Sequence, residues 1–147
     1  MPDITKDTSK ERPYAQVVQM LRRVDLRPTR QRLALAKLLF EGPNRHVTAE
    51  MLHEETEQAH INVSLATIYN SLHQFTDAGL LREVVVDSGR TYFDTNMTDH
   101  HHFFIEKEGC LEDIPEGVIT LDHLPDIPAG KKFSRIDVII HVADEDA

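Results

Sequence analysis

The chain has 147 residues, enough for one ordinary domain or two small ones, and its apolar content of 40% is ordinary for a soluble protein. It holds no apolar run near the roughly 20 residues that span a bilayer, and its polar N-terminus lacks the apolar core of a signal peptide, so we expect a cytoplasmic protein without membrane contact. The net charge of −9 argues against nucleic acid as a partner, and the single cysteine, Cys110, excludes an internal disulfide.

Four runs of helical periodicity occupy the first half of the chain. They cover residues 14–24, residues 29–40, a stretch that begins at 48, and residues 65–78. Thr29, Thr48 and Ser64 stand where the last three runs begin, and side chains of these types are good helix N-caps. Gly42 and Gly79 follow two of the runs, as is typical of helix ends.

Two β-rich runs follow the helices, at 80–86 and 91–94, and the turn Asp87-Ser88-Gly89-Arg90 joins them into a predicted β-hairpin. Three or four short helices followed by a hairpin is the order of elements in a winged helix-turn-helix domain. In such a domain the second helix of the helix-turn-helix enters the major groove of DNA. We therefore expect residues 65–78 to be the reading helix and residues 84–94 to be the wing.

After residue 95 the sequence becomes richer in strands and turns. Runs at 102–107 and 110–114, joined by Glu108-Gly109, predict a second hairpin, and apolar alternation over 135–142 predicts a further strand. This half is too small to bury a solid core alone. We expect its strands to complete a core against a second copy, in a symmetric homodimer.

These elements predict an α+β protein in which an N-terminal winged helix-turn-helix domain is followed by a small α/β dimerisation domain. We place a disordered tail at 1–12, the DNA-binding domain at 13–95, and the dimerisation and sensing domain at 96–147. Residues 12–45 carry eight basic against two acidic side chains, whereas 97–147 carry four against twelve. A basic first half favours a nucleic-acid partner, although solvated helix surfaces would explain the same charges.

The run His100-His101-His102 indicates a ligand site. On an extended chain alternate side chains share a face, so His100 and His102 lie on one face and His101 on the other. Two imidazoles placed in this way form half of a transition-metal site. The alternative is a solvated polar turn before a strand.

Five short motifs are each weak but are specific in combination. They are LRPTRQR at 26–32, HVTAE at 46–50, LATIYNSL at 65–72, DAGL at 77–80, and the histidine run. Together they resemble the ferric uptake regulator (Fur) family, over nearly everything from about residue 14 to residue 142. Within the family the chain looks most like the iron response regulator (Irr) branch of rhizobia and related α-proteobacteria.

The resemblance implies a dimeric, metal-sensing transcription factor whose sensor site draws ligands from both domains. It assigns these ligands to His46, in the loop before the third helix, and to Asp94, His100, His102 and Asp113. Mixed imidazole and carboxylate ligands suit Fe²⁺, Mn²⁺ or Zn²⁺. Ligands from two domains would let ion binding set the angle between them. Taken singly, His46 and Asp94 are also compatible with capping or surface roles.

The chain departs from the family pattern at the zinc ligands. Many members carry two C-x-x-C pairs that hold a structural zinc, but here the positions of the first pair are Ile105 and Glu108. We therefore expect no structural zinc held by four cysteines. A second metal site is represented only by His101 and Asp99.

The likeness to the Irr branch also implies a response to haem. Imidazole is a common axial ligand of haem, so His100, His101 and His102 are candidate haem ligands. Cys110 is followed by Leu111, so a Cys-Pro haem motif is absent and haem would bind through histidine.

The resemblance and the predicted elements together suggest the DNA contacts. Tyr69 resembles the family's tyrosine that packs on thymine methyl groups, and Asn70 stands where many members have arginine. Arg27 resembles the basic residue that reaches an A·T-rich minor groove. Phosphate contacts are expected from the reading helix N-terminus and from the wing, at Ser64, Thr67 and Arg90. The alternatives are solvated charges for the arginines and a half-buried core position for Tyr69.

We therefore expect an iron-responsive transcription regulator, not an enzyme, that binds A·T-rich double-stranded operator DNA as a homodimer. In an Irr-type response haem releases the DNA, whereas in a Fur-type response Fe²⁺ or Mn²⁺ is the corepressor, and the sequence does not decide the sign. A haem-binding or haem-trafficking protein is one alternative, but it leaves the basic first half unexplained. A metallohydrolase with Glu106 or Glu112 as base is another, but the chain has no H-E-x-x-H motif.

Overall fold

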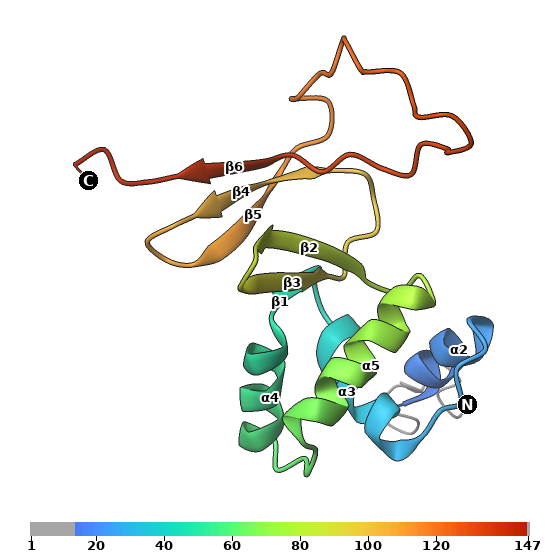
Figure 1. Cartoon of the computed structure of the whole chain (residues 1–147). Coiled ribbons are helices and arrows are strands. Elements are labelled where there is room, and N and C mark those ends of the chain that lie inside the picture. Colours follow the sequence, from blue (N-terminus) through green and yellow to red (C-terminus); the bar gives the residue numbers. More distant parts are fainter. Residues whose placement is uncertain (1–13, 147) are drawn as a thin grey trace, which may run out of the picture. The chain divides into compact units, whose positions relative to one another are not determined.

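The computed structural model describes residues 14–146, which form two compact units divided in sequence between Met97 and Thr98 (Figure 1). Unit 1 combines helices with a small sheet, and unit 2 contains a second small sheet. This mixture is the α+β class predicted from the sequence. The tail expected at residues 1–12 lies outside the described residues. Across residues 14–146, no helix has both the length and the apolar character that a bilayer span requires.

Three of the four helices described in unit 1 begin where the capping residues predict. The four helices are α2 (Ala15–Arg23), α3 (Arg30–Phe40), α4 (Ala49–Gln58) and α5 (Leu65–Asp77). The side-chain oxygens of Thr29, Thr48 and Ser64 each accept a hydrogen bond from the backbone N–H three residues later, at 3.1–3.2 Å. These bonds satisfy N–H groups that have no partner within the helix. The three predicted N-caps are therefore confirmed.

The core of unit 1 packs the helices against the sheet. Helix α5 contributes Ile68, Leu72 and Phe75, which are all fully buried and follow the spacing of one helix face. Each large apolar side chain buried in this way contributes about 1.5–3 kcal/mol. Because burial takes one face of α5, the other faces solvent, and it carries Tyr69 and Asn70.

The sheet of unit 1 is antiparallel and has the order β1-β3-β2 (Figure 1). Strands β2 (Arg82–Asp87) and β3 (Arg90–Asp94) form the predicted hairpin. The short strand β1 (His46–Val47) is a correction, because the sequence placed His46 in a loop. Two residues are too few to show a periodic pattern. This strand exists because it pairs with β3, where His46 lies opposite Asp94.

Unit 2 contains three strands in the order β5-β4-β6. Strands β4 (His101–Ile105) and β5 (Cys110–Ile114) form the second predicted hairpin. Gly109 closes its turn with a φ of 64° and donates its N–H to the Ile105 carbonyl at 2.8 Å. Glycine adopts this left-handed conformation without the steric cost that a Cβ would add.

The last strand is shorter than the sequence predicts. It is β6 (Ile139–Val142), which runs parallel to β4, rather than the whole of 135–142. The register places Ile139 opposite His102, near the start of β4. Residues before Val138 therefore lie beyond the end of β4 and have no strand there to extend the ladder. The apolar alternation in the sequence extends beyond the strand, because such a pattern does not reveal whether a neighbouring strand is present to pair with.

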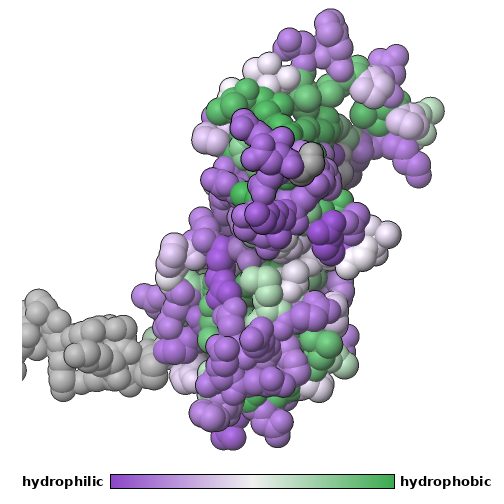
Figure 2. Space-filling view, turned by 90° about the vertical axis from the view of Figure 1, so that its left-hand side faces the viewer, coloured by the Kyte–Doolittle hydropathy of each residue, from purple (hydrophilic) through white to green (hydrophobic). Residues whose placement is uncertain are grey.

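Unit 2 buries little of its own apolar surface. Phe104, Leu111 and Ile114 are buried. The segment between β5 and β6 exposes large apolar side chains at Val118, Leu121, Leu124, Ile127 and Phe133. Figure 2 shows hydrophobic side chains gathered in the upper part of the view, where this segment lies. An exposed apolar surface of this kind marks an interaction site in soluble proteins.

Candidate metal centre and nucleic-acid interface

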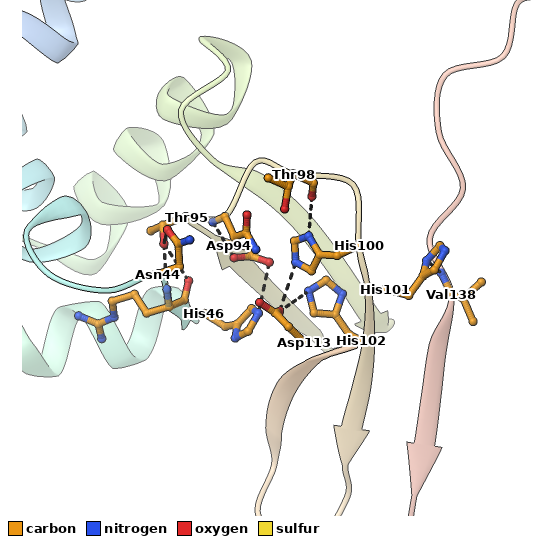
Figure 3. A network of polar contacts seen from close by, with 12 residues as sticks. Asn44, His46, Asp94, Thr95, Thr98, His100, His101, His102, Asp113 and Val138 are labelled. Atoms are coloured by element: carbon orange, nitrogen blue, oxygen red, sulfur yellow. Dashed lines mark hydrogen bonds and ion pairs between the residues drawn. The ribbon is translucent and has the colours of Figure 1, made fainter. Parts of the chain in front are cut away.

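Two buried imidazoles of unit 2 converge on one carboxylate (Figure 3). The Oδ1 atom of Asp113 lies 3.2 Å from Nε2 of His100 and 3.3 Å from Nε2 of His102. Strand pairing sets this geometry, because His102 lies opposite Asp113 in the β4–β5 register, and His100 lies two residues earlier on the same face. The alternation predicted for the histidine run is therefore what the structure shows.

The surroundings of these three side chains suit a metal ion. The imidazoles are 4% and 1% exposed, whereas the carboxylate of Asp113 is 38% exposed, which leaves a way in from solvent. Adjacent ligands bound to one ion at about 2.0–2.2 Å lie roughly 3 Å apart. The distances between Asp113 and the two imidazoles match that separation.

The tautomer of His100 is set by a backbone carbonyl. Its Nδ1 lies 2.5 Å from the carbonyl oxygen of Thr98 (Figure 3). A carbonyl only accepts hydrogen bonds, so Nδ1 donates and Nε2 is left to take a proton or a metal ion. Metal-binding histidines are commonly oriented in this way by a second hydrogen bond.

Unit 1 holds a further imidazole–carboxylate pair. The Nε2 atom of His46 lies 3.2 Å from Oδ2 of Asp94, and the two side chains are 15% and 0% exposed (Figure 3). The other oxygen of Asp94 accepts the backbone N–H of Asn96 at 2.8 Å. A fully buried carboxylate is costly unless a positive group or a hydrogen-bond donor faces it. His46 and Asp94 are therefore not surface side chains, Asp94 also caps the turn at Asn96, and the distance between the pair suits a shared proton or cation.

The segment that carries His46 is clamped from both sides. The guanidinium of Arg45 pairs with the carboxylate of Glu55 on α4, and it also donates to the Leu38 carbonyl at 3.3 Å. The backbone N–H of Arg45 donates to the hydroxyl of Thr95 at 2.9 Å, and its carbonyl accepts the Thr95 N–H at 3.1 Å. Sequence reasoning missed Arg45 and Glu55, since a spacing of ten residues follows no motif.

His101, the middle histidine of the run, makes a separate contact. The Nδ1 atom of His101 accepts the backbone N–H of Val138 at 3.0 Å, just before β6 begins. This bond holds the approach to β6 against β4. His101 therefore lies on the other face of β4 from His102, so the three candidate haem ligands do not form one set.

The predicted DNA contacts lie mainly on the exposed side of α5. Tyr69 is 38% exposed and Asn70 is exposed, so the alternative that Tyr69 is a core residue is not what the structure shows. The hydroxyl of Ser64 also bonds the hydroxyl of Thr67 at 2.9 Å, so both side chains are engaged in the helix cap. Thr67 contributes its backbone N–H to the same cap.

The hydroxyl of Tyr69 donates to Oε1 of Glu50 on α4 at 2.5 Å. This bond raises the pKa of Tyr69 above its ordinary value of 10.0, and burial and the negative charge of Glu50 act in the same direction. Glu50 belongs to the HVTAE motif, but nothing in the sequence pairs it with α5. It is a contact that sequence reasoning missed.

The two candidate arginines differ in their surroundings. Arg27 is exposed, and its carbonyl accepts a hydrogen bond from Arg32 at 3.0 Å. Arg32 also donates to Gln74 of α5 at 2.9 and 3.3 Å, which ties the segment of Arg27 to α5. In contrast, Arg90 pairs with Asp87 within the wing turn, and this pairing offsets its charge.

The comparisons with known proteins agree with this geometry. The model of the ferric uptake regulator family matches residues 23–135. The peroxide-responsive repressor PerR of Staphylococcus epidermidis is 30% identical over 129 residues, which are 88% of this chain and 77% of that protein. This relative is a peroxide-responsive repressor, so the finer likeness to the iron response regulator is not confirmed.

Solved structures show the same fold. The ferric uptake regulator of Vibrio cholerae has a TM-score of 0.69 at 20% identity and covers 87% of this chain and 99% of its own. The regulator of Pseudomonas aeruginosa with manganese has a TM-score of 0.65 at 22% identity and covers 86% and 96%. The predicted fold class, an N-terminal winged helix followed by a small dimerisation domain, is confirmed by this likeness.

Proposed function

The chain belongs to the ferric uptake regulator family of metal-responsive transcription regulators, and we propose that it binds A·T-rich operator DNA as a homodimer with an affinity set by a divalent metal ion. Regulators of this family bind iron, manganese or zinc, act as dimers, and are transcription factors rather than enzymes. That background argues against the metallohydrolase alternative. One of the two bases considered for it, Glu106, lies beside His141 instead.

The observation that carries this proposal is the convergence of His100 and His102 on Asp113. Two neutral imidazoles and a carboxylate are ligands of the borderline divalent ions Fe²⁺, Mn²⁺ and Zn²⁺. A purely structural role would not need three such groups with their ligand atoms within 4.8 Å of one another.

We assign His46 and Asp94 to the same ion. Only five residues separate Asp94 from His100 in the sequence, and that stretch spans at most about 20 Å when extended. An ion that takes ligands from both units restricts their relative orientation, and this restriction is how binding energy can change DNA affinity. The proposed ligands are therefore His46, Asp94, His100, His102 and Asp113.

The DNA-binding surface belongs to unit 1. Support comes from the exposed face of α5 with Tyr69 and Asn70, and from Arg27, which Arg32 ties to the same helix. Base-edge contacts by α5 would give sequence preference, whereas basic side chains would give affinity. Ser64, Thr67 and Arg90 are proposed phosphate contacts.

Haem binding through His100, His101 and His102 stays a prediction. His101 is used by the contact with Val138, and the two other rings face a carboxylate. These contacts favour a divalent ion, rather than haem, as the species that His100 and His102 bind. Haem added to the full chain would give a Soret band only if a histidine ligates it.

The test is the fluorescence anisotropy of labelled DNA titrated with the full chain, using an A·T-rich palindrome and a scrambled duplex. We expect the affinity for the palindrome, but not for the scrambled duplex, to change at least tenfold between buffer with Mn²⁺ and buffer with a chelator. The direction decides whether the ion is a corepressor or releases the DNA. An affinity that is indifferent to Mn²⁺, Fe²⁺ and Zn²⁺ would overturn the proposal.

A further inference from the structure

The contact between Tyr69 and Glu50 fixes an exposed ring on the proposed reading helix. The core positions of α5 are taken by Ile68, Leu72 and Phe75, so packing below the helix does not hold Tyr69. An exposed tyrosine can exchange rotamers freely on a fast timescale. The 2.5 Å bond from its hydroxyl to Oε1 of Glu50 favours one of these rotamers.

Glu50 itself is placed rigidly. It is the second residue of α4, directly after Ala49, which is 1% exposed, and Thr48, whose hydroxyl caps the helix. Leu52 is fully buried two residues later. The backbone of Glu50 is therefore anchored on both sides while its side chain reaches across to α5.

A carboxylate at this place is not explained by affinity for DNA. Glu50 is exposed next to the face of α5 that carries Tyr69 and Asn70, and a negative charge near phosphates is repelled. An acidic residue in the first turn of a helix does stabilise it by interaction with the helix dipole. That effect does not require contact with Tyr69, so it does not explain the hydrogen bond between Tyr69 and Glu50.

We propose that Glu50 is a positioning residue that holds the Tyr69 ring in the orientation in which it contacts bases, so that this chain gains operator selectivity at some cost in general DNA affinity. The inference rests on the proposed function, because it needs α5 to enter DNA. The Tyr69 hydroxyl is protonated at neutral pH, since even its ordinary pKa is 10.0, and it is therefore a donor to Glu50.

The variants Glu50→Ala and Glu50→Gln separate positioning from charge. Glu50→Ala removes both the acceptor and the charge, so we expect specific affinity to fall about five- to tenfold, the net effect of losing one hydrogen bond that solvent partly replaces. Affinity for scrambled DNA should stay equal or rise, because a repulsive charge is gone. Glu50→Gln keeps an acceptor oxygen, so it should retain specific binding.

A matched control and a double-mutant cycle complete the design. Glu54→Ala removes an acidic charge from the same helix four residues later, and specific binding should not fall. Tyr69→Phe removes only the hydroxyl and should cost at least as much specific affinity as Glu50→Ala, which also removes a repulsive charge. The double variant should cost no more than either single one, because both remove the same contact. Thermal unfolding checks that each variant is folded.

A readout without DNA tests the contact itself. In the free protein, Glu50→Ala should lower the pKa of Tyr69 toward its ordinary value. The absorbance of tyrosinate measures this titration, and Tyr69→Phe serves as the reference that lacks the Tyr69 signal. An unchanged titration, additive losses in the cycle, or a rise in specific as well as non-specific affinity for Glu50→Ala would overturn the inference. A wild-type chain that does not distinguish the palindrome from scrambled DNA would instead overturn the proposed function.

Discussion

The Asp113 carboxylate lies within 3.3 Å of the imidazoles of both His100 and His102. Replacing Asp113 with Asn keeps its shape and removes its charge. We expect the affinity for Mn²⁺ to fall at least tenfold, since loss of groups that support a metal site costs 10–100-fold and Asp113 is proposed as a ligand itself. Because the side chain is partly exposed, the fold should survive, and isothermal titration calorimetry with Mn²⁺ measures the change.

The neighbouring acid on β5 is the control for this substitution. Glu112 precedes Asp113, so its side chain points to the opposite face of the strand, and it is exposed. Glu112→Gln removes the same charge from the same strand and should leave the affinity for Mn²⁺ unchanged. Equal losses in both variants would mean that only net charge matters and that Asp113 is not a ligand.

Asp87 makes the wing turn sensitive to acid. The Arg90 side chain, followed by the Gly89 N–H, lowers the pKa of Asp87 below its ordinary value of 3.8. A carboxylate with a lowered pKa stabilises the folded state above that ordinary value, and the contribution is lost as pH falls through the lowered pKa. The difference in Tm between wild type and Asp87→Asn should therefore be constant near neutral pH and vanish in strong acid. A difference that grows as pH falls would contradict this assignment.

At the scale of elements, the sequence predicts what local chemistry decides and misses what distant pairing decides. Thr29, Thr48 and Ser64 predict helix starts because a cap is a contact within one turn. Strand β1 escapes prediction because its two residues have no pattern of their own. The prediction for β6 is too long because alternation does not reveal where β4 begins.

The sequence likewise predicts some residues of the candidate sites and misses others. The histidine run and its alternation follow from the sequence, and the remaining ligands follow from the family resemblance. Contacts around the candidate metal site and the proposed DNA surface join residues far apart in sequence, such as Arg45 with Thr95 and Tyr69 with Glu50. Nothing local in a sequence marks such pairs, since each residue alone is an ordinary polar side chain.

The link between Arg32 and α5 gives a prediction for the reading helix. Arg32→Met keeps the aliphatic stem and removes the bonds to Arg27 and Gln74. We expect operator affinity to fall several-fold, with a reduced preference for A·T over G·C in the flanking sequence, because Arg27 is no longer held against α5. Arg30→Met removes the same charge from the same helix and should lower affinity without changing that preference. Anisotropy titrations with operators that carry A·T-rich or G·C-rich flanking sequence measure this preference. An equal loss of preference in Arg32→Met and Arg30→Met would refute the role of Arg32.

At the scale of the whole molecule, the exposed apolar side chains of unit 2 predict a second copy of the chain as partner. Leu124 and Phe133 are each 54% exposed, and burial of such side chains contributes about 1.5–3 kcal/mol each. Replacing both with Asp should convert a dimer into a monomer in sedimentation experiments and weaken binding to a palindrome. A wild-type chain that sediments as a monomer, or a variant that stays dimeric, would show that this surface has another purpose.

The central claim is that one divalent ion takes ligands from unit 1 and unit 2 together. Calorimetric titration of Mn²⁺ into the wild-type chain, His46→Ala and His102→Ala tests it most directly. The account predicts one tight site per chain, weakened at least tenfold by either substitution and not much further by both. Tight binding that survives His46→Ala unchanged, or two independent sites that each lose one histidine, would contradict it.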